Sequence, residues 1–260
     1  MFKKLSPALI IIGLITACAT SPTGRSQFMF LSEQQVDQMG LQAFNDLKQK
    51  KPISNNPAYN QLANCIARAI TQETGGQWEV VVFNDKTPNA FALPGNKIGV
   101  HTGMITLVDN PDQLAAVIGH EVGHVLAKHS NERASQQMAV SQGMSLIQAV
   151  SAPQTALGQT AIGLLGVGAQ YGILMPYSRI HESEADRIGL NLMAKAGFDP
   201  RQSIGLWQKM ERASQGRQPI EFLSTHPSHA TRIQELEQHM PEAMGLFQQA
   251  QSMGKQPHCS

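Results

Sequence analysis

The sequence has few charged residues, few cysteines and no uninterrupted apolar run of membrane-spanning length. Charged residues make up only 15% of its 260 residues, and its formal net charge is +1. This balance argues against a nucleic-acid-binding protein, which needs clustered positive charge. No stretch offers the ~20 consecutive apolar residues of a membrane-spanning helix. The chain does have 42% hydrophobic residues, enough to bury one substantial core, and we expect a single domain over residues 31–260.

The first 17 residues have the pattern of a lipoprotein signal peptide. Two lysines precede an apolar run over residues 8–15 that is too short to span a bilayer, and small residues lead to Cys18. We expect cleavage before Cys18, lipidation of this cysteine and a short tether over residues 18–30. An ordinary signal peptide with an incidental cysteine is the alternative. Because no aspartate follows the cysteine, the predicted location is the periplasmic face of the outer membrane of a Gram-negative bacterium.

Only three cysteines are present, and lipidation of Cys18 would leave Cys65 and Cys259 as one pair. In an oxidising compartment they can form a disulfide that ties the C-terminal tail to an early helix. The sequence leaves this pairing open, because a cysteine near the chain terminus can also stay free or bridge to another molecule.

The segment His120-Glu121-Val122-Gly123-His124 has the clearest chemical meaning in the chain. On a helix, residues four apart share a face, so His120 and His124 can bind one metal ion. Glu121 lies about 100° further round the helix, where its carboxylate can reach a water molecule at that ion. The pattern predicts one catalytic Zn²⁺ per chain with Glu121 as its general base.

The alternative, a surface helix with two solvated histidines, fits the flanking residues poorly. The segment is apolar on most sides, through Leu114, Ala115, Ala116, Val117, Ile118, Val122, Val125 and Leu126. A buried helix does not carry two histidines and a glutamate without partners. Asn110 is a good N-cap and Pro111 a good first residue, so this helix should begin at about residue 111.

Two histidines leave a catalytic zinc one protein ligand short, and a helix over residues 178–197 is the expected source of the third. Gly197 marks its end, in the position that favours glycine. Glu182 and Asp186 share one face of this helix. That spacing suits a zinc ligand and a carboxylate that holds a zinc-bound histidine by its other ring nitrogen, while Glu184 should point elsewhere.

These motifs together resemble one family of zinc proteases. HExxH followed by Glu182-Ser-Glu-Ala-Asp186 is similar to the pattern of the gluzincin metalloproteases that include HtpX, the CAAX prenyl endopeptidases, the mitochondrial inner-membrane quality-control protease and outer-membrane lipoprotein members. Later and earlier landmarks of the family agree over residues 89–95, 98–103, 196–200 and 224–232. The resemblance implies that His120, His124 and Glu182 bind zinc. It also implies that Glu121 is the base and Asp186 the orienting residue.

The predicted fold is α+β, mostly helical and of the zincin type, with a helical tail after residue 231. Helices are expected over residues 32–50, capped by Ser32, and over residues 57–73. A small antiparallel sheet ahead of the metal helix is indicated by residues 78–83, 90–93 and 97–101. In metalloproteases of this type an extended substrate adds to an edge strand, and residues 91–101 are the expected edge.

His226, in the segment Thr225-His226-Pro227, is the second candidate catalytic residue. Beside the zinc it could stabilise the oxyanion or occupy the fourth ligand position until substrate displaces it. The other interpretation is a role in loop structure together with Arg232. Tyr177 is a weaker candidate for the same task.

Residues 138–175 form a long apolar stretch that glutamines interrupt. We expect packed helices or a mobile cover near the active site. Peripheral contact with a membrane is the alternative.

The predicted function is zinc-dependent endopeptidase activity on unfolded or misassembled envelope proteins, in outer-membrane protein quality control. The substrate follows from the predicted location, and a partner in the assembly machinery is left open. One alternative is a peptidase of cell-wall or small-peptide substrates. Another is a lipoprotein that binds or escorts outer-membrane proteins and has a latent zinc site. Glu121 favours an enzyme, because a structural zinc site needs no base.

Overall fold

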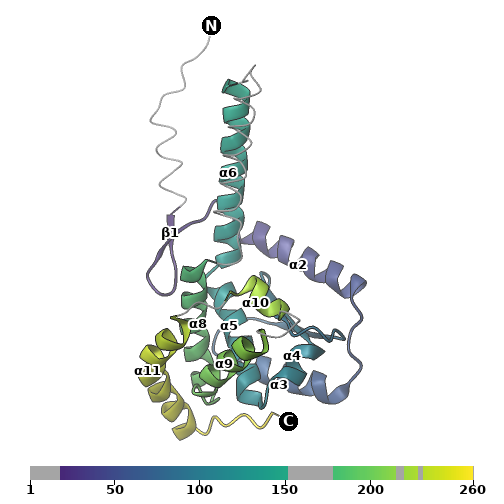
Figure 1. Ribbon diagram of the computed structural model, residues 1–260, viewed down its shortest axis with the longest axis vertical. Helices are drawn as coiled ribbons and strands as arrows, with labels where there is room; N and C mark the ends of the chain where they lie inside the picture. Colours follow the sequence, from purple (N-terminus) through teal and green to yellow (C-terminus); the bar gives the residue numbers. More distant parts are fainter. Residues whose placement is uncertain (1–17, 152–177, 215–219, 228–230, 260) are drawn as a thin grey trace. The chain divides into compact units, whose positions relative to one another are not determined.

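The computed structural model describes residues 18–151, 178–214, 220–227 and 231–259 (Figure 1). The predicted signal peptide, Tyr177 and residues 152–175 of the apolar stretch lie outside the described residues. In the part that is described, none of the helices combines the length and the apolarity needed to cross a bilayer. The described residues fall into two compact units, one within Met1–Val36 and Lys128–Met175 and the other within Asp37–Ala127 and Pro176–Ser260.

Helices dominate both units, which confirms the prediction of a mostly helical α+β fold. α2 (Glu33–Lys50) begins after Ser32, whose hydroxyl accepts a hydrogen bond from the backbone N–H of Gln35. The helices of the larger unit after it are α3 (Pro57–Thr71), α4 (Thr102–Leu107), α5 (Pro111–Leu126), α8 (Arg179–Lys195), α9 (Gln202–Ser214), α10 (Glu221–Thr225) and α11 (Arg232–Ser252). α5 begins at the predicted residue, since the Asn110 side chain accepts from the N–H of Gln113 and Pro111 follows the cap.

The larger unit contains a three-stranded sheet beside α5. Its strands are β3 (Glu79–Phe83), β4 (Ala90–Leu93) and β5 (Lys97–His101), in the order β3-β5-β4. β4 and β5 are antiparallel, but β3 runs parallel to β5. The prediction of an antiparallel sheet is therefore wrong for β3, because an apolar strand pattern fixes which side chains face the core and not the direction of the neighbouring strand.

The edge of this sheet is also narrower than predicted. Of residues 91–101, only the part in β4 lies at an edge, since β5 is the central strand. Gly95 and Asn96 make the turn between the two strands with φ of 78° and 60°. β4 itself packs beside α5, so the edge strand and the HExxH helix are neighbours.

Glycines bring α5 and α8 into backbone contact. A Cβ atom at Gly119 would meet the carbonyl oxygen of Gly189 at 2.8 Å, and one at Gly123 would meet that of Ala185 at 2.8 Å. In the other direction, a Cβ atom at Gly189 would stand 2.6 Å from the backbone nitrogen of His120. The absence of side chains at these positions lets residues of the two helices reach a common point.

The smaller unit holds α6 (His129–Ser151) and a two-stranded antiparallel ribbon, β1 (Cys18–Thr20) and β2 (Ser26–Phe28). Arg25 makes a two-pronged ion pair with Glu132 of α6 at 2.6 and 2.8 Å, and the amide of Gln27 donates to the same carboxylate. Part of the segment expected as a tether therefore forms a ribbon that is bonded to α6. The sequence could not indicate this, since Arg25 and Glu132 lie 107 residues apart.

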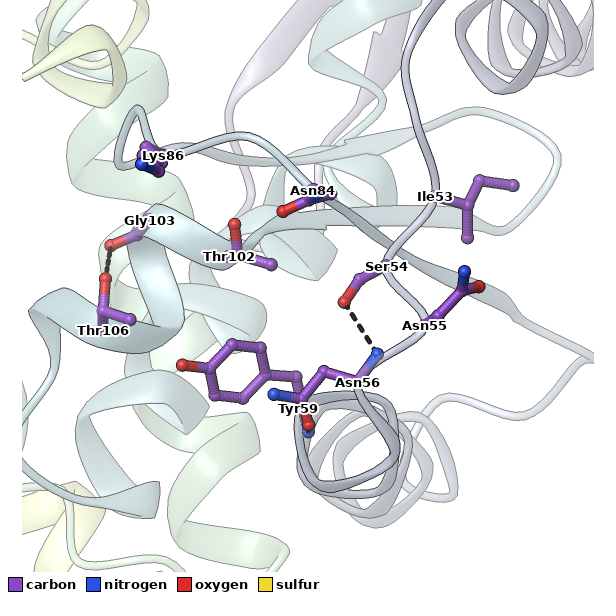
Figure 2. Close-up of a pocket in the computed structure, with 10 residues that line it drawn as sticks. All are labelled: Ile53, Ser54, Asn55, Asn56, Tyr59, Asn84, Lys86, Thr102, Gly103 and Thr106. Atoms are coloured by element: carbon purple, nitrogen blue, oxygen red, sulfur yellow. Dashed lines mark hydrogen bonds between the residues drawn. The ribbon is translucent and has the colours of Figure 1, made fainter.

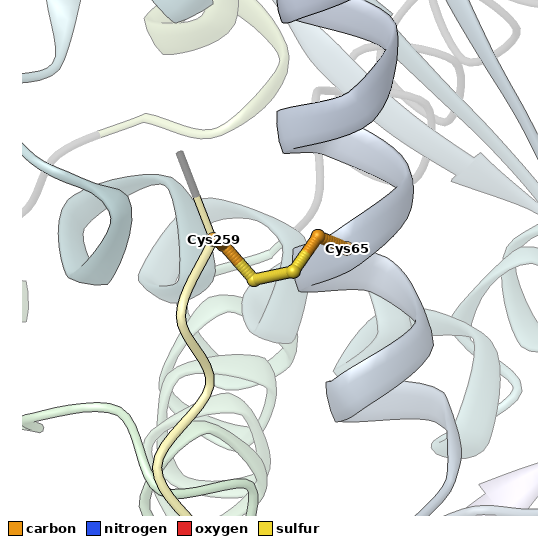
Figure 3. The surroundings of a disulfide bond; sticks show 2 residues. All are labelled: Cys65 and Cys259. Carbon is orange, nitrogen blue, oxygen red and sulfur yellow. A yellow bond between two sulfur atoms is a disulfide. The ribbon is translucent and has the colours of Figure 1, made fainter.

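A disulfide joins Cys65 of α3 to Cys259, with the two Cα atoms 5.6 Å apart (Figure 3). Of the outcomes that the sequence left open, the intramolecular bond is confirmed. The tail that it secures follows α11 and is also held by an ion pair between Lys255 and Glu73 at 2.5 Å. The C-terminal end is therefore fixed to the second helix of the larger unit.

Candidate metal centre

Four buried side chains from three parts of the larger unit converge on one point. His120 and His124 extend from α5, Glu182 from α8, and His226 from the residue that ends α10. One nitrogen or oxygen of each lies within 4.8 Å of the others. Each of the four residues is at most 3% exposed. The close packing of α5 on α8 therefore produces a concentrated set of metal ligands.

The spacing of these atoms suits a small tetrahedral ion. Nε2 of His120 lies 3.0 Å from Nε2 of His124 and 3.4 Å from a Glu182 oxygen, and Nε2 of His124 lies 3.4 Å from the other Glu182 oxygen. Nδ1 of His226 is 3.2 Å from Nε2 of His120 and 3.1 Å from Glu182 Oε1. Ligand atoms around a tetrahedral zinc ion are expected about 3.3 Å apart, from metal–ligand distances near 2.0–2.1 Å. The donor set of two imidazoles and a carboxylate, with this spacing, fits zinc.

Asp186 determines which nitrogen of His120 faces the cluster. Its Oδ1 lies 2.8 Å from Nδ1 of His120, so a neutral ring donates Nδ1–H to Asp186 and presents the lone pair of Nε2. Nε2 of His124 lies 3.0 Å from this nitrogen. A metal ion at the cluster would be bound by the Nε2 lone pair of each neutral imidazole.

Glu121 is the carboxylate next to this cluster, and it is 3% exposed. Its Oε2 accepts a hydrogen bond of 3.2 Å from the backbone N–H of Ala92 in the edge strand β4. Its Oε1 makes no well-aligned hydrogen bond with the described residues and lies 3.3 Å from Nε2 of His226. Burial raises the pKa of Glu121, so its carboxylate is a stronger base than in water.

Arg232, at the start of α11, is the cation that balances the centre. It is 1% exposed, its Nη2 donates to Asp186 at 2.7 Å and to Glu182 at 3.2 Å, and its Nε lies 2.6 Å from Asp186. Burial alone would raise the pKa of Asp186, but the charge of Arg232 and the hydrogen bond from His120 lower it. Likewise, burial would raise the pKa of Glu182, and hydrogen bonds from the histidines hold it below its usual range. Arg232 and a Zn²⁺ ion together would neutralise the three buried carboxylates.

The structure brings the predicted site residues together. His120, His124 and Glu182 form the cluster with His226, and Asp186 contacts His120 as expected from the helical spacing. Glu184 is buried but lies outside the cluster, which agrees with the expectation that it points elsewhere. The roles of these residues stay predictions.

Two residues contact the metal centre in ways that the sequence did not indicate. Arg232 was expected only to support loop structure, and Trp207 of α9 carried no signal at all. The ring of Trp207 lies under the guanidinium group, with Cζ of Arg232 3.3 Å from the ring centroid. A tryptophan on the apolar face of a helix looks like any core residue, so sequence reasoning has no means to find it.

A separate cavity of about 570 Å³ lies between the start of α3 and α4 (Figure 2). It is lined mainly by amide and hydroxyl side chains, with Lys86 as its one charged residue: Ile53, Ser54, Asn55, Asn56, Tyr59, Asn84, Lys86, Thr102, Gly103 and Thr106. None of its lining residues is a histidine, cysteine, aspartate or glutamate. This cavity is distinct from the metal centre.

Comparison with known proteins agrees with this geometry. The chain matches peptidase family M48 over residues 54–240, which include the whole His120, His124, Glu182 and His226 cluster. It is 35% identical over 228 residues to the mitochondrial metalloendopeptidase OMA1 of Schizosaccharomyces pombe, with 85% of this chain and 66% of the relative covered. For the human mitochondrial metalloendopeptidase OMA1 the identity is 32% over 232 residues, with 86% and 44% covered. For the beta-barrel assembly-enhancing protease of Escherichia coli it is 27% over 256 residues, with 90% and 52% covered. The chain thus spans less than two thirds of the length of each of these relatives.

Proposed function

Since the chain belongs to peptidase family M48, we propose that it is a zinc-dependent endopeptidase and that the cluster around His120 is its catalytic centre. The observation that carries this proposal is the place of Glu121. Its carboxylate is buried beside three zinc-type ligands and is anchored through Oε2, while Oε1 makes no well-aligned hydrogen bond within the described part of the chain and lies 3.3 Å from Nε2 of His226. A structural zinc site closes on four protein ligands and has no use for such a base.

In this proposal zinc, when bound, acts as a Lewis acid on the peptide carbonyl and makes water more acidic. The residues of the chain manage the proton. Glu121 takes a proton from the attacking water through Oε1 and returns it to the leaving amine. The N–H of Ala92 holds the other oxygen in place during both transfers. Burial raises the pKa of Glu121, which makes its carboxylate a better proton acceptor.

His226 has a place of its own in this proposal. Its Nδ1 lies where a fourth ligand would be, 3.1 Å from Glu182 and 3.2 Å from His120. We therefore assign His226 as a resting-state ligand that substrate displaces, rather than as a fixed oxyanion donor. His226 directly follows α10. A hydrogen bond of 3.3 Å from the backbone N–H of Phe222 to the carbonyl of Pro88 links this helix to the segment before β4.

The same contact favours a second candidate function. A centre closed by His226 is what a binding or chaperone factor with a latent zinc site would have. Glu121 argues for the enzyme, since a latent site makes no use of a base. Chaperone activity that survives Glu121→Gln, without any cleavage by the unmodified protein, would support the second function.

The deciding experiment is cleavage of an unfolded protein by the soluble form that begins at Ala19, with zinc content measured in every sample. Glu121→Gln is compared with Glu237→Gln, the same chemical change at an exposed position of α11. We expect zinc in all three proteins and cleavage by the unmodified protein and by Glu237→Gln only. Cleavage that persists in Glu121→Gln would show that Glu121 is not the general base.

We further propose that the substrates are unfolded or misassembled envelope proteins and that Cys18 anchors the protein by a lipid to the periplasmic face of the outer membrane. The N-terminal sequence pattern supports this location, as does the similarity to a bacterial protease named for beta-barrel assembly. The relatives named as mitochondrial share the family but not this location. Mass spectrometry of the N-terminal peptide and membrane fractionation of Cys18→Ser test the anchor. A soluble Cys18→Ser variant is expected, and an unmodified Cys18 in the original protein would contradict lipidation.

A further inference from the structure

Trp207 contacts Arg232, His120 and Phe222 beside the metal centre, although it belongs to a helix that supplies none of the four clustered ligands. It is 5% exposed, and its ring supports the guanidinium group of Arg232 at 3.3 Å from Cζ to centroid. Its ring also meets the ring of His120 edge to face, with centroids 5.6 Å apart. On another side it lies 5.7 Å from the ring of Phe222, which in turn stacks on His226 at 4.5 Å.

The contact with Arg232 matters because of what Arg232 holds. The guanidinium group donates to Asp186 and to Glu182, and Asp186 in turn accepts from His120. A chain of contacts therefore runs from the ring of Trp207 to Arg232. From Arg232 it continues to the ligand Glu182 and to Asp186, which orients the imidazole of His120. A buried arginine side chain has four rotatable bonds. A flat aromatic face against the guanidinium group limits the orientations that this group can adopt.

We propose that Trp207 is a positioning residue of the metal centre, which acts through Arg232 to hold Asp186 and Glu182 in the geometry that binds the metal. The proposal rests on the zinc site of the proposed function and goes beyond it, because α9 then sets the strength of metal binding. A residue that merely fills the core would have a different signature. Any apolar side chain of similar size would replace it, and its loss would weaken folding without a separate effect on the metal.

The test is the zinc dissociation constant, measured by competition with a coloured chelator on the folded soluble form beginning at Ala19. Trp207→Leu removes the aromatic face, and Trp207→Phe retains one. Leu206→Ala is the matched control, since Leu206 is the preceding residue of α9 and is fully buried in the core. Loss of a contact that orients metal ligands typically weakens metal binding about 10- to 100-fold.

We expect zinc binding to weaken at least about tenfold in Trp207→Leu, in line with that range, and to change little in Trp207→Phe. Leu206→Ala should lower the thermal unfolding midpoint and leave the zinc affinity near that of the original protein. Equal losses of zinc affinity in Trp207→Leu and Leu206→Ala would overturn the proposal, because they would reduce Trp207 to a packing residue.

A double-mutant cycle tests the route through Arg232. In an Arg232→Met background, Trp207→Leu should have no further effect on zinc affinity. If Arg232→Met does not fold, Arg232→Lys replaces it as the background of the cycle. Lysine keeps the positive charge but lacks the planar group that stacks on the indole. A full additional loss in either background would overturn the route.

The zinc-affinity test of Trp207 can fail independently of the cleavage test of the proposed endopeptidase activity. A protein that binds zinc and cleaves nothing would contradict the endopeptidase activity and leave the zinc affinities to decide on Trp207. An original protein that binds no zinc would overturn both proposals.

Discussion

Gly189 of α8 lies against the backbone of His120 on α5, so closely that a Cβ atom at Gly189 would stand 2.6 Å from the His120 nitrogen. The atoms that such a Cβ would meet are all backbone atoms, which cannot move aside as a side chain can. Glu182 and Asp186 lie on the same helix as Gly189, and His120 and His124 lie on the other. The ligand geometry therefore depends on a helix contact that only glycine permits.

Gly189→Ala should separate the two helices and damage both stability and metal binding. Overpacking of this kind typically costs about 1–3 kcal/mol. We expect a loss in that range by urea unfolding, together with weaker zinc binding. Gly245→Ala is the control, since nothing lies within 4 Å of a Cβ at that position of α11. Alanine there should stabilise the helix by about 1 kcal/mol. A Gly189→Ala protein with unchanged stability and zinc affinity would contradict the dependence of the centre on this contact.

His226→Ala should raise the rate of peptide cleavage, because it removes the resting-state ligand from the position that substrate needs. Zinc affinity should fall at the same time, since one of four donors is lost. His239→Ala, on α11 and outside the cluster, is the control. Loss of an oxyanion donor typically lowers kcat about 10²- to 10³-fold, so a drop of that size in His226→Ala would instead establish His226 as a donor to the transition state.

Asp85→Asn should lower stability at neutral pH by about 0.5–1 kcal/mol, as is typical of a partly exposed ion pair. Lys51 donates to Asp85 at 2.9 Å, and this hydrogen bond holds the pKa of Asp85 below its usual value. The folded state then resists protonation that the unfolded chain accepts, so the stabilisation is present above about pH 4 and is lost as the pH falls below it.

The difference between the original protein and Asp85→Asn should therefore shrink below about pH 4. Urea unfolding at a series of pH values measures it. Asp46→Asn, at an exposed position of α2, is the control and should stay within about 0.5 kcal/mol of the original protein throughout. A difference that grows on acidification would contradict the assigned ion pair.

Cleavage of the Cys65–Cys259 bond should destabilise the larger unit. The bond joins residues 194 apart in sequence, and loss of a native disulfide typically costs about 2–5 kcal/mol. Reductant should lower the unfolding midpoint of the original protein and leave a Cys65→Ser, Cys259→Ser double variant unaffected. An equal effect of reductant on both proteins would show that the stabilisation does not come from this bond.

The sequence indicated which side chains of the candidate centre come together where their spacing is local. His120 and His124, like Glu182 and Asp186, are pairs four residues apart, and helical geometry alone puts each pair on one face. His226 and Arg232 lie far along the chain in a segment without periodicity. Only the resemblance to known proteases brought His226 forward, and nothing in the residues indicated that Arg232 would be buried among carboxylates.

The limits of the prediction for the fold have the same origin. The α5 boundary was correct because Asn110 and Pro111 act within one helical turn. The parallel pairing of β3 with β5 and the ion pair of Arg25 with Glu132 join distant segments, and such pairings leave no mark on the local pattern. Trp207 shows the extreme case, since its place beneath Arg232 depends on how α9 and α11 pack.

The disulfide also changes what a break in the backbone would do. Residues 65 to 259 form a covalently closed loop that contains the whole ligand cluster and Glu121. A single nick anywhere inside this loop, including one made by the protein on itself, releases no fragment. The nicked molecule would keep its mass apart from one added water, migrate as one species without reductant and fall into two pieces once the sulfur bridge is opened.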